Sequence, residues 1–280
     1  MMVARPPENQ LMAEKTLYDV LRDIWAAKFF MLGFAVMMVL AAFIFLSLSH
    51  NFYQAEMIIA PASPMGSALS EGAKTPEGTI QTQQGDFQSN AAFLRFENIY
   101  DGTSVASFLV QDKDIVAAFA LDRAFTFSEG RTHWDAQSLS EYLKKKVRLE
   151  PISGTPLRRL TYMHTDKLFA VDLIKRVHRI TDEMIRARIL VETNQRIDYL
   201  NASIVKTTNP DHRRTLAGLL MEQERLKMMV SLDQPYAASV IEPAYVSARP
   251  RWPDPYVIYS VFILIGLLFG FVTYGLRHHA

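Results

Sequence analysis

Two uncharged runs near the two ends of the chain dominate its pattern of apolar and polar positions. Phe29–Ser49 and Tyr256–Leu276 each contain 21 residues without a charged side chain. At about 1.5 Å per residue, each run forms a helix of roughly 31 Å, which matches the hydrocarbon thickness of a bilayer. The alternatives are a signal peptide for the first run and buried core helices for both. A signal peptide has a shorter apolar centre and a basic start, whereas four acidic side chains precede Phe29. The pattern therefore predicts two transmembrane helices.

Basic residues beside the two runs predict their orientation. Four lie on the terminal side and two, Arg249 and Arg251, on the other side; the terminal four are Lys15, Arg22, Lys28 and Arg277. Positive charge is enriched on the cytoplasmic side of membrane helices, so we expect both termini in the cytoplasm and the bulk of the chain in the periplasm. The expected organisation is a cytoplasmic amphipathic segment (1–28), a first span (29–49), a periplasmic domain (50–255), a second span (256–276) and a cytoplasmic tail (277–280).

Between the spans, short β-rich runs alternate with helical patterns. Gly, Pro, Ser and Thr are frequent in Pro61–Asp86, which predicts a mobile loop. Ser138 and Glu141 have the spacing of a capping box at the start of a helix. The predicted strands are Phe52–Ala60, Val147–Pro151, Leu157–Met163 and a last one within Ala237–Val246, which is strand-like up to Pro243. The predicted helices are Ala91–Tyr100, Ser104–Val110, Lys113–Leu121 and Ser138–Lys146. The second and third strands are separated by a turn, and the first and last are expected to meet in one sheet near the membrane.

The longest helical signal runs from Asp166 to Lys206 and is followed, after Asn209-Pro210-Asp211, by a second amphipathic helix. A short break between two such helices predicts an antiparallel hairpin. An apolar stripe on the first helix comprises Leu173, Val177, Ile180, Met184 and Val191. This stripe serves either the core of one protomer or the packing between copies. The predicted fold class is α+β: two transmembrane helices flank a periplasmic domain with a small membrane-proximal sheet and a helical hairpin.

Composition removes several classes of function. The chain carries 30 Lys and Arg residues against 29 Asp and Glu, so no global charge favours nucleic acid. It has no cysteine, which excludes disulfides and cysteine-ligated metals. It also lacks the HExxH, GxxxxGK[ST] and GxSxG motifs of zinc proteases, nucleotide-binding loops and hydrolases. We therefore predict that the chain is not an enzyme and has no catalytic, cofactor-binding or metal-binding residues.

A cluster of basic residues and a pair of glycines are candidate contact sites. Lys175, Arg176, Arg179 and Arg186 make the long helix locally basic, which suits contact with an anionic polymer or a lipid phosphate. The alternative is a solvated face that neighbouring acidic residues partly neutralise. Gly266 and Gly270 have the small-xxx-small spacing that allows transmembrane helices to approach closely. The alternative there is an ordinary lipid-facing sequence.

Prolines are concentrated just before the second apolar run. Pro243, Pro250, Pro253 and Pro255 cannot continue a helix or donate to a sheet. The segment from Pro243 to Pro255 is therefore predicted to be an extended, semi-rigid strut that fixes the distance between the sheet and the membrane.

The order of these elements resembles the polysaccharide co-polymerases, also called Wzz-type chain-length determinants. The resemblance is carried by LYDVLRDIWAAK before the first span, YQAEMIIAP after it, and IEPAYVSARPRWPDP before the second span. Its most distinctive part is VRLEPISGTPLRRLTYMHTDKLFAVDLIKRV, which is similar to the family's strand, Gly-Thr turn, strand and Asp-led helix. Gly154, Thr155 and Asp166 occupy those positions.

The resemblance implies a non-catalytic scaffold in a bacterial inner membrane. Such a protein forms a ring-shaped homo-oligomer and works with a polymerase or exporter of a surface polysaccharide, whose chain length it sets or whose synthesis it couples to export. A separate kinase and an outer-membrane export protein are further candidate partners. Two alternatives from the sequence are a two-span sensor that signals through a separate partner and an export adaptor that reaches an outer-membrane pore.

Overall fold

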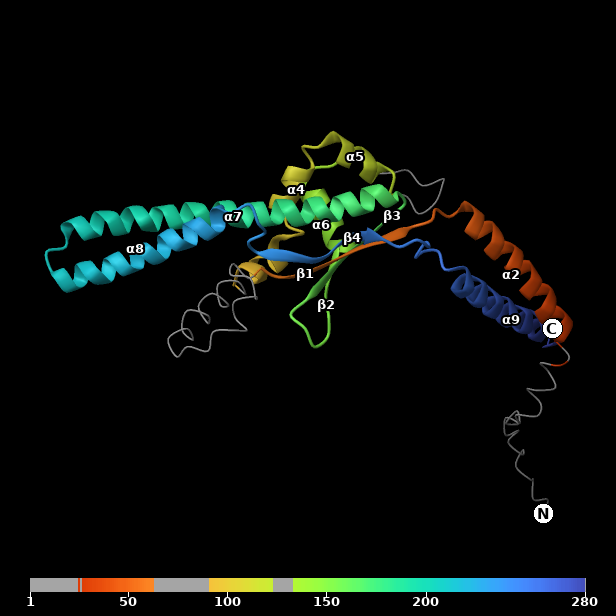
Figure 1. Ribbon diagram of the computed structural model, residues 1–280. Helices are drawn as coiled ribbons and strands as arrows, with labels where there is room; N and C mark the ends of the chain where they lie inside the picture. Colours follow the sequence, from red (N-terminus) through yellow and green to blue (C-terminus); the bar gives the residue numbers. More distant parts are fainter. Residues whose placement is uncertain (1–24, 26, 63–90, 123–132, 280) are drawn as a thin grey trace, which may run out of the picture. The chain divides into compact units, whose positions relative to one another are not determined.

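The structure is a computed structural model that describes residues 25, 27–62, 91–122 and 133–279 (Figure 1). The expected cytoplasmic amphipathic segment (1–28) lies almost entirely outside the described residues, as does most of the expected loop Pro61–Asp86. The chain divides into two compact units. One contains the two long apolar helices, and the other, His50–Trp252, contains a four-stranded sheet and the remaining helices. The predicted α+β class with a small sheet, a helical hairpin and two candidate membrane helices is confirmed.

The first unit is a pair of helices, α2 (Lys28–Leu48) and α9 (Pro255–His279). The most apolar parts of these helices have mean hydropathies of 2.7 and 2.3, and only 6% and 11% of those parts is buried. A core helix of a soluble domain would be mostly buried, whereas these two expose apolar side chains along their length. Both are long enough to cross a bilayer as helices, the form in which a single segment satisfies its own backbone. The pair therefore fits a two-span membrane protein.

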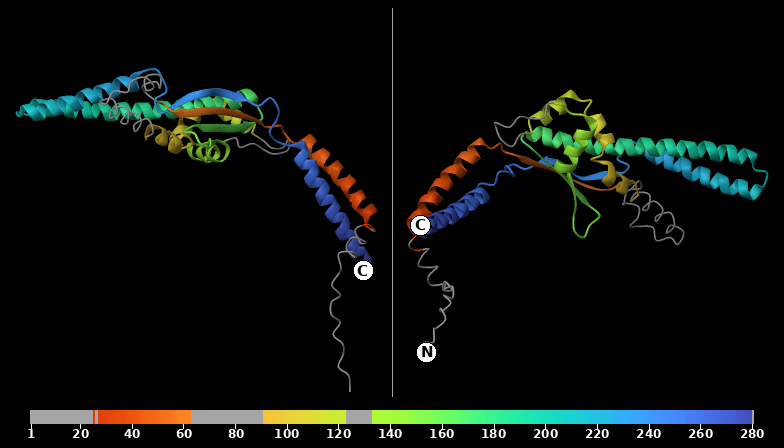
Figure 2. Two further views of the ribbon diagram at one scale, coloured as in Figure 1. Left: turned by 60° about the horizontal axis from the view of Figure 1, so that its bottom comes forward. Right: turned by 180° about the vertical axis from the view of Figure 1, so that it is seen from behind.

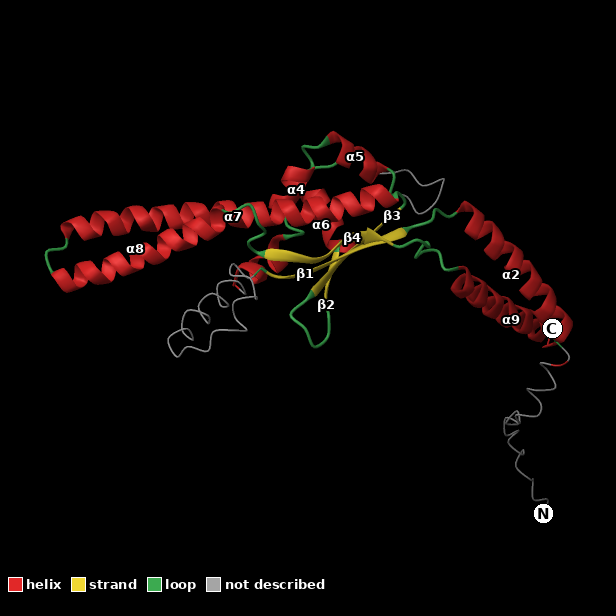
Figure 3. Ribbon diagram, in the orientation of Figure 1, coloured by secondary structure: helices red, strands yellow, loops and turns green. Residues whose placement is uncertain are grey.

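The second unit is built on one antiparallel sheet with strand order β2-β3-β1-β4 (Figure 3). The strands are β1 (Tyr53–Pro61), β2 (Arg148–Pro151), β3 (Arg158–His164) and β4 (Ala238–Val246). Alternate side chains of β1 enter the core, so Ala55, Met57 and Ile59 are buried. The predicted pairing of the first strand with the last, and of the second with the third, is confirmed.

The proline segment is shorter than predicted at its start. Pro243 lies inside β4, which continues to Val246. The register of β1 with β4 shifts between Glu56 and Ile58, so the strand bulges at this point. A proline is tolerated here because β4 is an edge strand, where a missing N–H costs little. Residues 247–254, with Pro250 and Pro253, join β4 to α9; they bend at Ala248, Arg249 and Pro253, and Trp252 forms an isolated bridge with Phe52. Pro255 is the first residue of α9.

Short helices contribute to the same core as the sheet: residues 91–99, α4 (Thr103–Leu109), α5 (Lys113–Ala120) and α6 (Ala136–Lys146). Of these, α4 packs on α6 and on α7 (Lys167–Lys206). The predicted capping box of α6 is wrong, because the helix begins two residues earlier than expected. The side chain of Asp135 accepts a hydrogen bond from the Ser138 backbone N–H, and the Ser138 hydroxyl accepts one from the Asp135 N–H. Ser138 is thus the third helical residue rather than the cap.

The helical hairpin consists of α7 (Lys167–Lys206) and α8 (Pro210–Ser231). The N-terminal half of α7 crosses one face of the sheet, and its C-terminal half extends beyond the sheet beside α8 (Figures 1 and 2). Asp166 and Asn209 cap the two helices by accepting backbone N–H groups. The predicted hairpin is confirmed.

The buried face of α7 departs from the predicted stripe in its second half. Leu173 and Val177 are fully buried, and Ile180 and Met184 are partly buried, but Val191 is 57% exposed. In the second half of α7 the buried face instead comprises Ile185, Ile189, Thr193, Ile197 and Leu200. The stripe shifts because α7 packs first on the sheet and then on α8, which lies against a different side of the helix.

Candidate functional site

The two glycines of α9 lie against the backbone of α2. A Cβ added to Gly266 would come within 2.9 Å of the Ala35 Cα, and one added to Gly270 within 2.5 Å of the Met31 Cα. Real Cβ atoms do not approach backbone atoms this closely, so neither position has room for a side chain. By contrast, Gly275 and Gly33 of the same pair have nothing within 4 Å. The close approach of the two helices depends on glycine at positions 266 and 270.

The residues of the strand, turn and helix motif each have a local structural role. Gly154 has φ of 77°, a left-handed conformation that favours glycine, at the turn between β2 and β3. In the same turn the Thr155 hydroxyl donates to the Ile152 carbonyl at 2.9 Å. Asp166 accepts hydrogen bonds from the N–H groups of Leu168 and Phe169 and so begins α7. These residues fix where β2 turns into β3 and where α7 starts.

The four basic residues of α7 do not form one free patch. Arg176 donates to Asp172 at 2.5 Å and to Asp112, in the loop before α5, at 2.6 Å. These contacts anchor α7 to the segment that caps α5. Arg179 lies 3.9 Å from Glu183, and Lys175 is exposed. The engagement of Arg176 supports the solvated, partly neutralised face rather than a site that holds a polymer.

Arg186 belongs to a buried constellation around Asp182. The carboxylate of Asp182 accepts the backbone N–H of Tyr236 at 2.9 Å and that of Ala237 at 2.7 Å, and it pairs with Arg186 at 3.3 Å. Arg186 also donates to the Gln234 carbonyl. Only about 5% of the Asp182 side chain is exposed. We call these contacts the Asp182 clasp; it ties the segment between α8 and β4 to the middle of α7.

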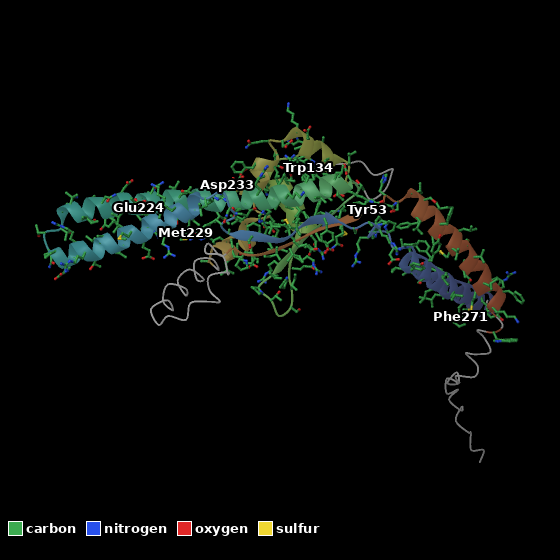
Figure 4. The ribbon with its side chains drawn as sticks, in the orientation of Figure 1. Tyr53, Trp134, Glu224, Met229, Asp233 and Phe271 are labelled. Atoms are coloured by element: carbon green, nitrogen blue, oxygen red, sulfur yellow. The ribbon has the colours of Figure 1, made fainter. Side chains whose placement is uncertain are left out.

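A second buried polar group lies between α5, α6 and β3. The Tyr142 hydroxyl donates to Asp122 at 2.6 Å and is hydrogen-bonded to the Tyr162 hydroxyl at 2.8 Å. Lys146 pairs with the same carboxylate at 3.2 Å. Burial raises the pKa of both phenols well above their usual value, so both remain protonated. Trp134, which is labelled in Figure 4, and Phe119 both pack against Tyr142 and complete this part of the core.

His164 links this group to the start of α7. Its Nδ1 accepts the backbone N–H of Asp166 at 3.0 Å, so the proton is on Nε2, which donates to the Ala118 carbonyl at 3.2 Å. Burial lowers the pKa of His164 below its usual value, and the imidazole is neutral. His178 is similar: it donates from Nε2 to the Ala238 carbonyl at 2.7 Å, and burial lowers its pKa. Both histidines have structural hydrogen bonds rather than the exposure of a general base.

An open groove runs between the two helices of the hairpin. It has a volume of about 500 Å³. Gln195, Arg196 and Tyr199 of α7 face Leu219 and Gln223 of α8 across it. Among the described residues, no three histidine, aspartate or glutamate side chains gather as a metal site requires.

Several solved structures are similar to this chain, and one of them is described as a full-length bacterial polysaccharide co-polymerase. It is 14% identical in sequence, with a TM-score of 0.48. The match covers 94% of this chain and 98% of that one. No family model matches the chain, and no curated protein matches its sequence.

The Asp182 clasp and the hairpin groove are the features that the sequence reasoning missed. Asp182 appears in the sequence as one of two adjacent acidic residues on a helix, next to Glu183. The only available signal was that Asp182 lies one turn from the buried His178 and four residues before Arg186. The partners Tyr236 and Ala237 are 54 and 55 residues away along the chain, so no local pattern marks them.

Proposed function

We propose that this chain is a non-catalytic scaffold of the polysaccharide co-polymerase class in a bacterial inner membrane. It sets the chain length of a surface polysaccharide or couples the synthesis of that polymer to its export. The observation that carries the proposal is the order of the elements: two apolar helices bracket an α+β unit, and that unit contains the strand, Gly-Thr turn, strand and Asp-capped long helix.

The proposed topology follows the distribution of basic residues. Both termini lie in the cytoplasm, and residues 50–255 form the periplasmic domain between spans at 29–49 and 256–276. Lys28 and Arg277 lie at one end of the antiparallel pair of helices, whereas Arg249 and Arg251 precede the opposite end of α9. The excess of basic residues on the terminal side supports this orientation.

The proposed active form is a ring of identical subunits that engages a polysaccharide polymerase or exporter. Apolar side chains on the outside of the hairpin support packing between copies. Val191, Met221 and Met228 are 57%, 74% and 63% exposed, although each would gain free energy on burial. A separate kinase and an outer-membrane export protein remain candidate partners of the ring.

The test is the size distribution of surface and secreted polysaccharide from a strain that lacks this protein, compared with the complemented strain. A shifted or broader distribution supports a scaffold that sets chain length, and complete loss of polymer supports an obligatory synthesis or export subunit. Unchanged amount and length would refute the proposal. Electron microscopy of the purified protein separates the scaffold from the two-span sensor, because a closed ring of many copies contradicts a dimeric sensor.

A further inference from the structure

We propose that one end of the unit His50–Trp252 docks on the surface of the bilayer and binds the phosphate groups of anionic lipids there. We call it the basic end, because four basic side chains from three separate segments gather on it: Lys146, Lys167, Arg249 and Arg251. The inference rests on the two membrane spans of the proposed topology, but it does not depend on a role in polysaccharide synthesis.

Two lysines from distant parts of the sequence lie beside the first residues of the sheet. The Nζ atom of Lys146, at the end of α6, lies 5.6 Å from the centre of the Phe52 ring. The Nζ atom of Lys167, at the start of α7, lies 4.2 Å from the centre of the ring of Tyr53, which is labelled in Figure 4. Lys167 also donates to the carbonyl of Ala248 at 3.4 Å. These contacts bring both lysines to the point where β1 begins and the chain leaves β4.

Short connections hold this end close to the two membrane helices. Phe52 and Trp252 form an isolated bridge, and only residues 49–51 separate Phe52 from Leu48, the last residue of α2. Only residues 253 and 254 separate Trp252 from Pro255, the first residue of α9. An extended chain advances at most about 3.6 Å per residue, so the bridge lies within about 14 Å of each helix end. The headgroup layer on each side of a bilayer is roughly 5–8 Å thick, so long basic side chains at this end can reach it.

The positive charge of the basic end is largely available to a ligand. Within the part of the chain that the structure describes, Lys167 and the two arginines form no ion pair, and both arginines are exposed. Two acidic side chains lie nearby, and both are engaged. Asp122 pairs with Lys146 at 3.2 Å, and Asp166 accepts the backbone N–H groups that begin α7. The excess charge matches an anionic partner.

Exposed apolar and aromatic side chains accompany the charges. Leu168, which follows Lys167 in the first turn of α7, is 83% exposed. Trp252 belongs to the same end and packs edge-on against Phe52. Basic side chains together with leucine or tryptophan are the combination by which helices lie in the interface of an anionic membrane. A free phosphate or a soluble anionic polymer offers no apolar surface to Leu168, so these residues favour lipid.

The first experiment places an environment-sensitive fluorophore at position 168. Because the chain has no cysteine, Leu168→Cys gives a single labelling site in the full chain, reconstituted into nanodiscs of phosphatidylcholine and phosphatidylglycerol. Val205→Cys is the matched control: Val205 is also 83% exposed, and it lies near the other end of the same helix. About 56 Å of helix separates the two positions. We expect lipid with a nitroxide on its headgroup to quench the label at 168 several-fold more strongly than the label at 205.

The second experiment tests the charges. Native mass spectrometry of the full chain in detergent measures its preference for phosphatidylglycerol over phosphatidylcholine. Each basic residue near an anionic lipid surface strengthens attachment about fivefold, so Lys167→Gln combined with Arg249→Gln should lower this preference at least about tenfold. The control combines Lys175→Gln with Lys206→Gln, two exposed lysines of α7 outside the basic end, and should change the preference less than about twofold. The basic residues beside the cytoplasmic ends of the spans are the same in every variant, so lipid bound there cancels in the comparison.

Three results would overturn the inference. One is an unchanged lipid preference in the variant of Lys167 and Arg249. Another is displacement of the lipid by inorganic phosphate as effectively as by phosphatidylglycerol, which would indicate a simple anion site. The third is a label at 168 that is shielded from water but not quenched by the nitroxide lipid, because position 168 would then contact another copy of the chain. Extraction with alkaline carbonate tests the spans separately: a chain that stays in the membrane with a water-exposed label at 168 refutes the basic end alone.

Discussion

The Asp182 clasp makes a strong prediction about stability. Replacing Asp182 with alanine removes the acceptor for two buried backbone N–H groups, those of Tyr236 and Ala237. It also leaves Arg186, whose side chain is only 20% exposed, without its carboxylate. The Nε of Arg186 is already buried without a hydrogen-bond partner in the described structure, so little else is available to compensate. The segment between α8 and β4 then loses its attachment to α7.

The size of the effect follows from these contacts. Each buried N–H left without an acceptor costs about 1–3 kcal/mol, and a broken buried ion pair costs about 3–5 kcal/mol when one charge is left behind. The costs overlap because one carboxylate makes all the contacts. Alanine is also a better helix former than aspartate by up to about 0.7 kcal/mol, which offsets a small part of the loss. We expect Asp182→Ala to lower the free energy of unfolding by about 3–5 kcal/mol.

The assay is thermal unfolding of the full chain in detergent, followed by near-ultraviolet circular dichroism. A domain of about 200 residues loses roughly 2–4 °C in Tm per kcal/mol, so Asp182→Ala should lower Tm by roughly 6–20 °C. Glu183→Ala is the control, because that neighbouring carboxylate is 61% exposed and lies 3.9 Å from Arg179. It should change stability by less than about 1 kcal/mol. Equal effects of the two substitutions would refute the assigned role of Asp182.

Three further predictions concern glycines and a buried histidine. Gly270→Ala should separate α2 from α9 and lower the yield of an engineered disulfide between them, whereas Gly275→Ala, which has open space, should leave that yield unchanged. Gly154→Ala should lower the free energy of unfolding by about 1–2 kcal/mol, because φ at this position is positive. Gly218→Ala should raise the free energy of unfolding by about 0.5–1 kcal/mol, because alanine is the better helix former and has open space inside α8. Denaturant titration measures both changes. The folded pKa of His164 is depressed, so the unfolded chain binds more protons below about pH 6.5, and stability should fall as pH decreases through that value. The dependence of stability on pH should be weaker in His164→Gln, in which His178 still contributes because its pKa is also lowered, as urea titrations at several pH values would show.

Local patterns were sufficient for most of the fold. The alternation of apolar residues in β1, the Gly-Thr turn and the break at Asn209-Pro210 all act over a few residues, so their spacing indicates the structure directly. The pairing of β1 with β4 was predicted because both strands adjoin the apolar runs at the ends of the chain. The start of α6 was predicted wrongly because its capping box pairs Asp135 with Ser138, whereas the usual pattern has glutamate or glutamine at the third helical position.

Long-range contacts account for most of what sequence reasoning did not predict. Along its own helix Arg176 has Asp172 as a visible partner, but its second partner, Asp112, lies 64 residues away. The predicted stripe follows one side of α7 from Leu173 to Val191, but α7 packs on the sheet first and on α8 afterwards. Pro243 was expected to end its strand because proline has no N–H to donate to a neighbouring strand. At the edge position of β4 this missing donor costs little, so the strand continues past Pro243.

The position of β1 in the middle of the sheet has a consequence for how the protein is made. β1 is among the first strands to be synthesised, but one of its two edges is covered only by β4; the contact between Gln54 and Ser247 joins residues 193 positions apart. Until the ribosome has passed β4, that edge of β1 has no partner within the chain, and an unpaired edge is a template for association with other chains. A nascent or truncated product that stops before Ala238 therefore contains the central strand of the sheet but cannot complete it. Closing this long loop is a late and slow step, and the newly made chain must be protected from aggregation until that step is finished.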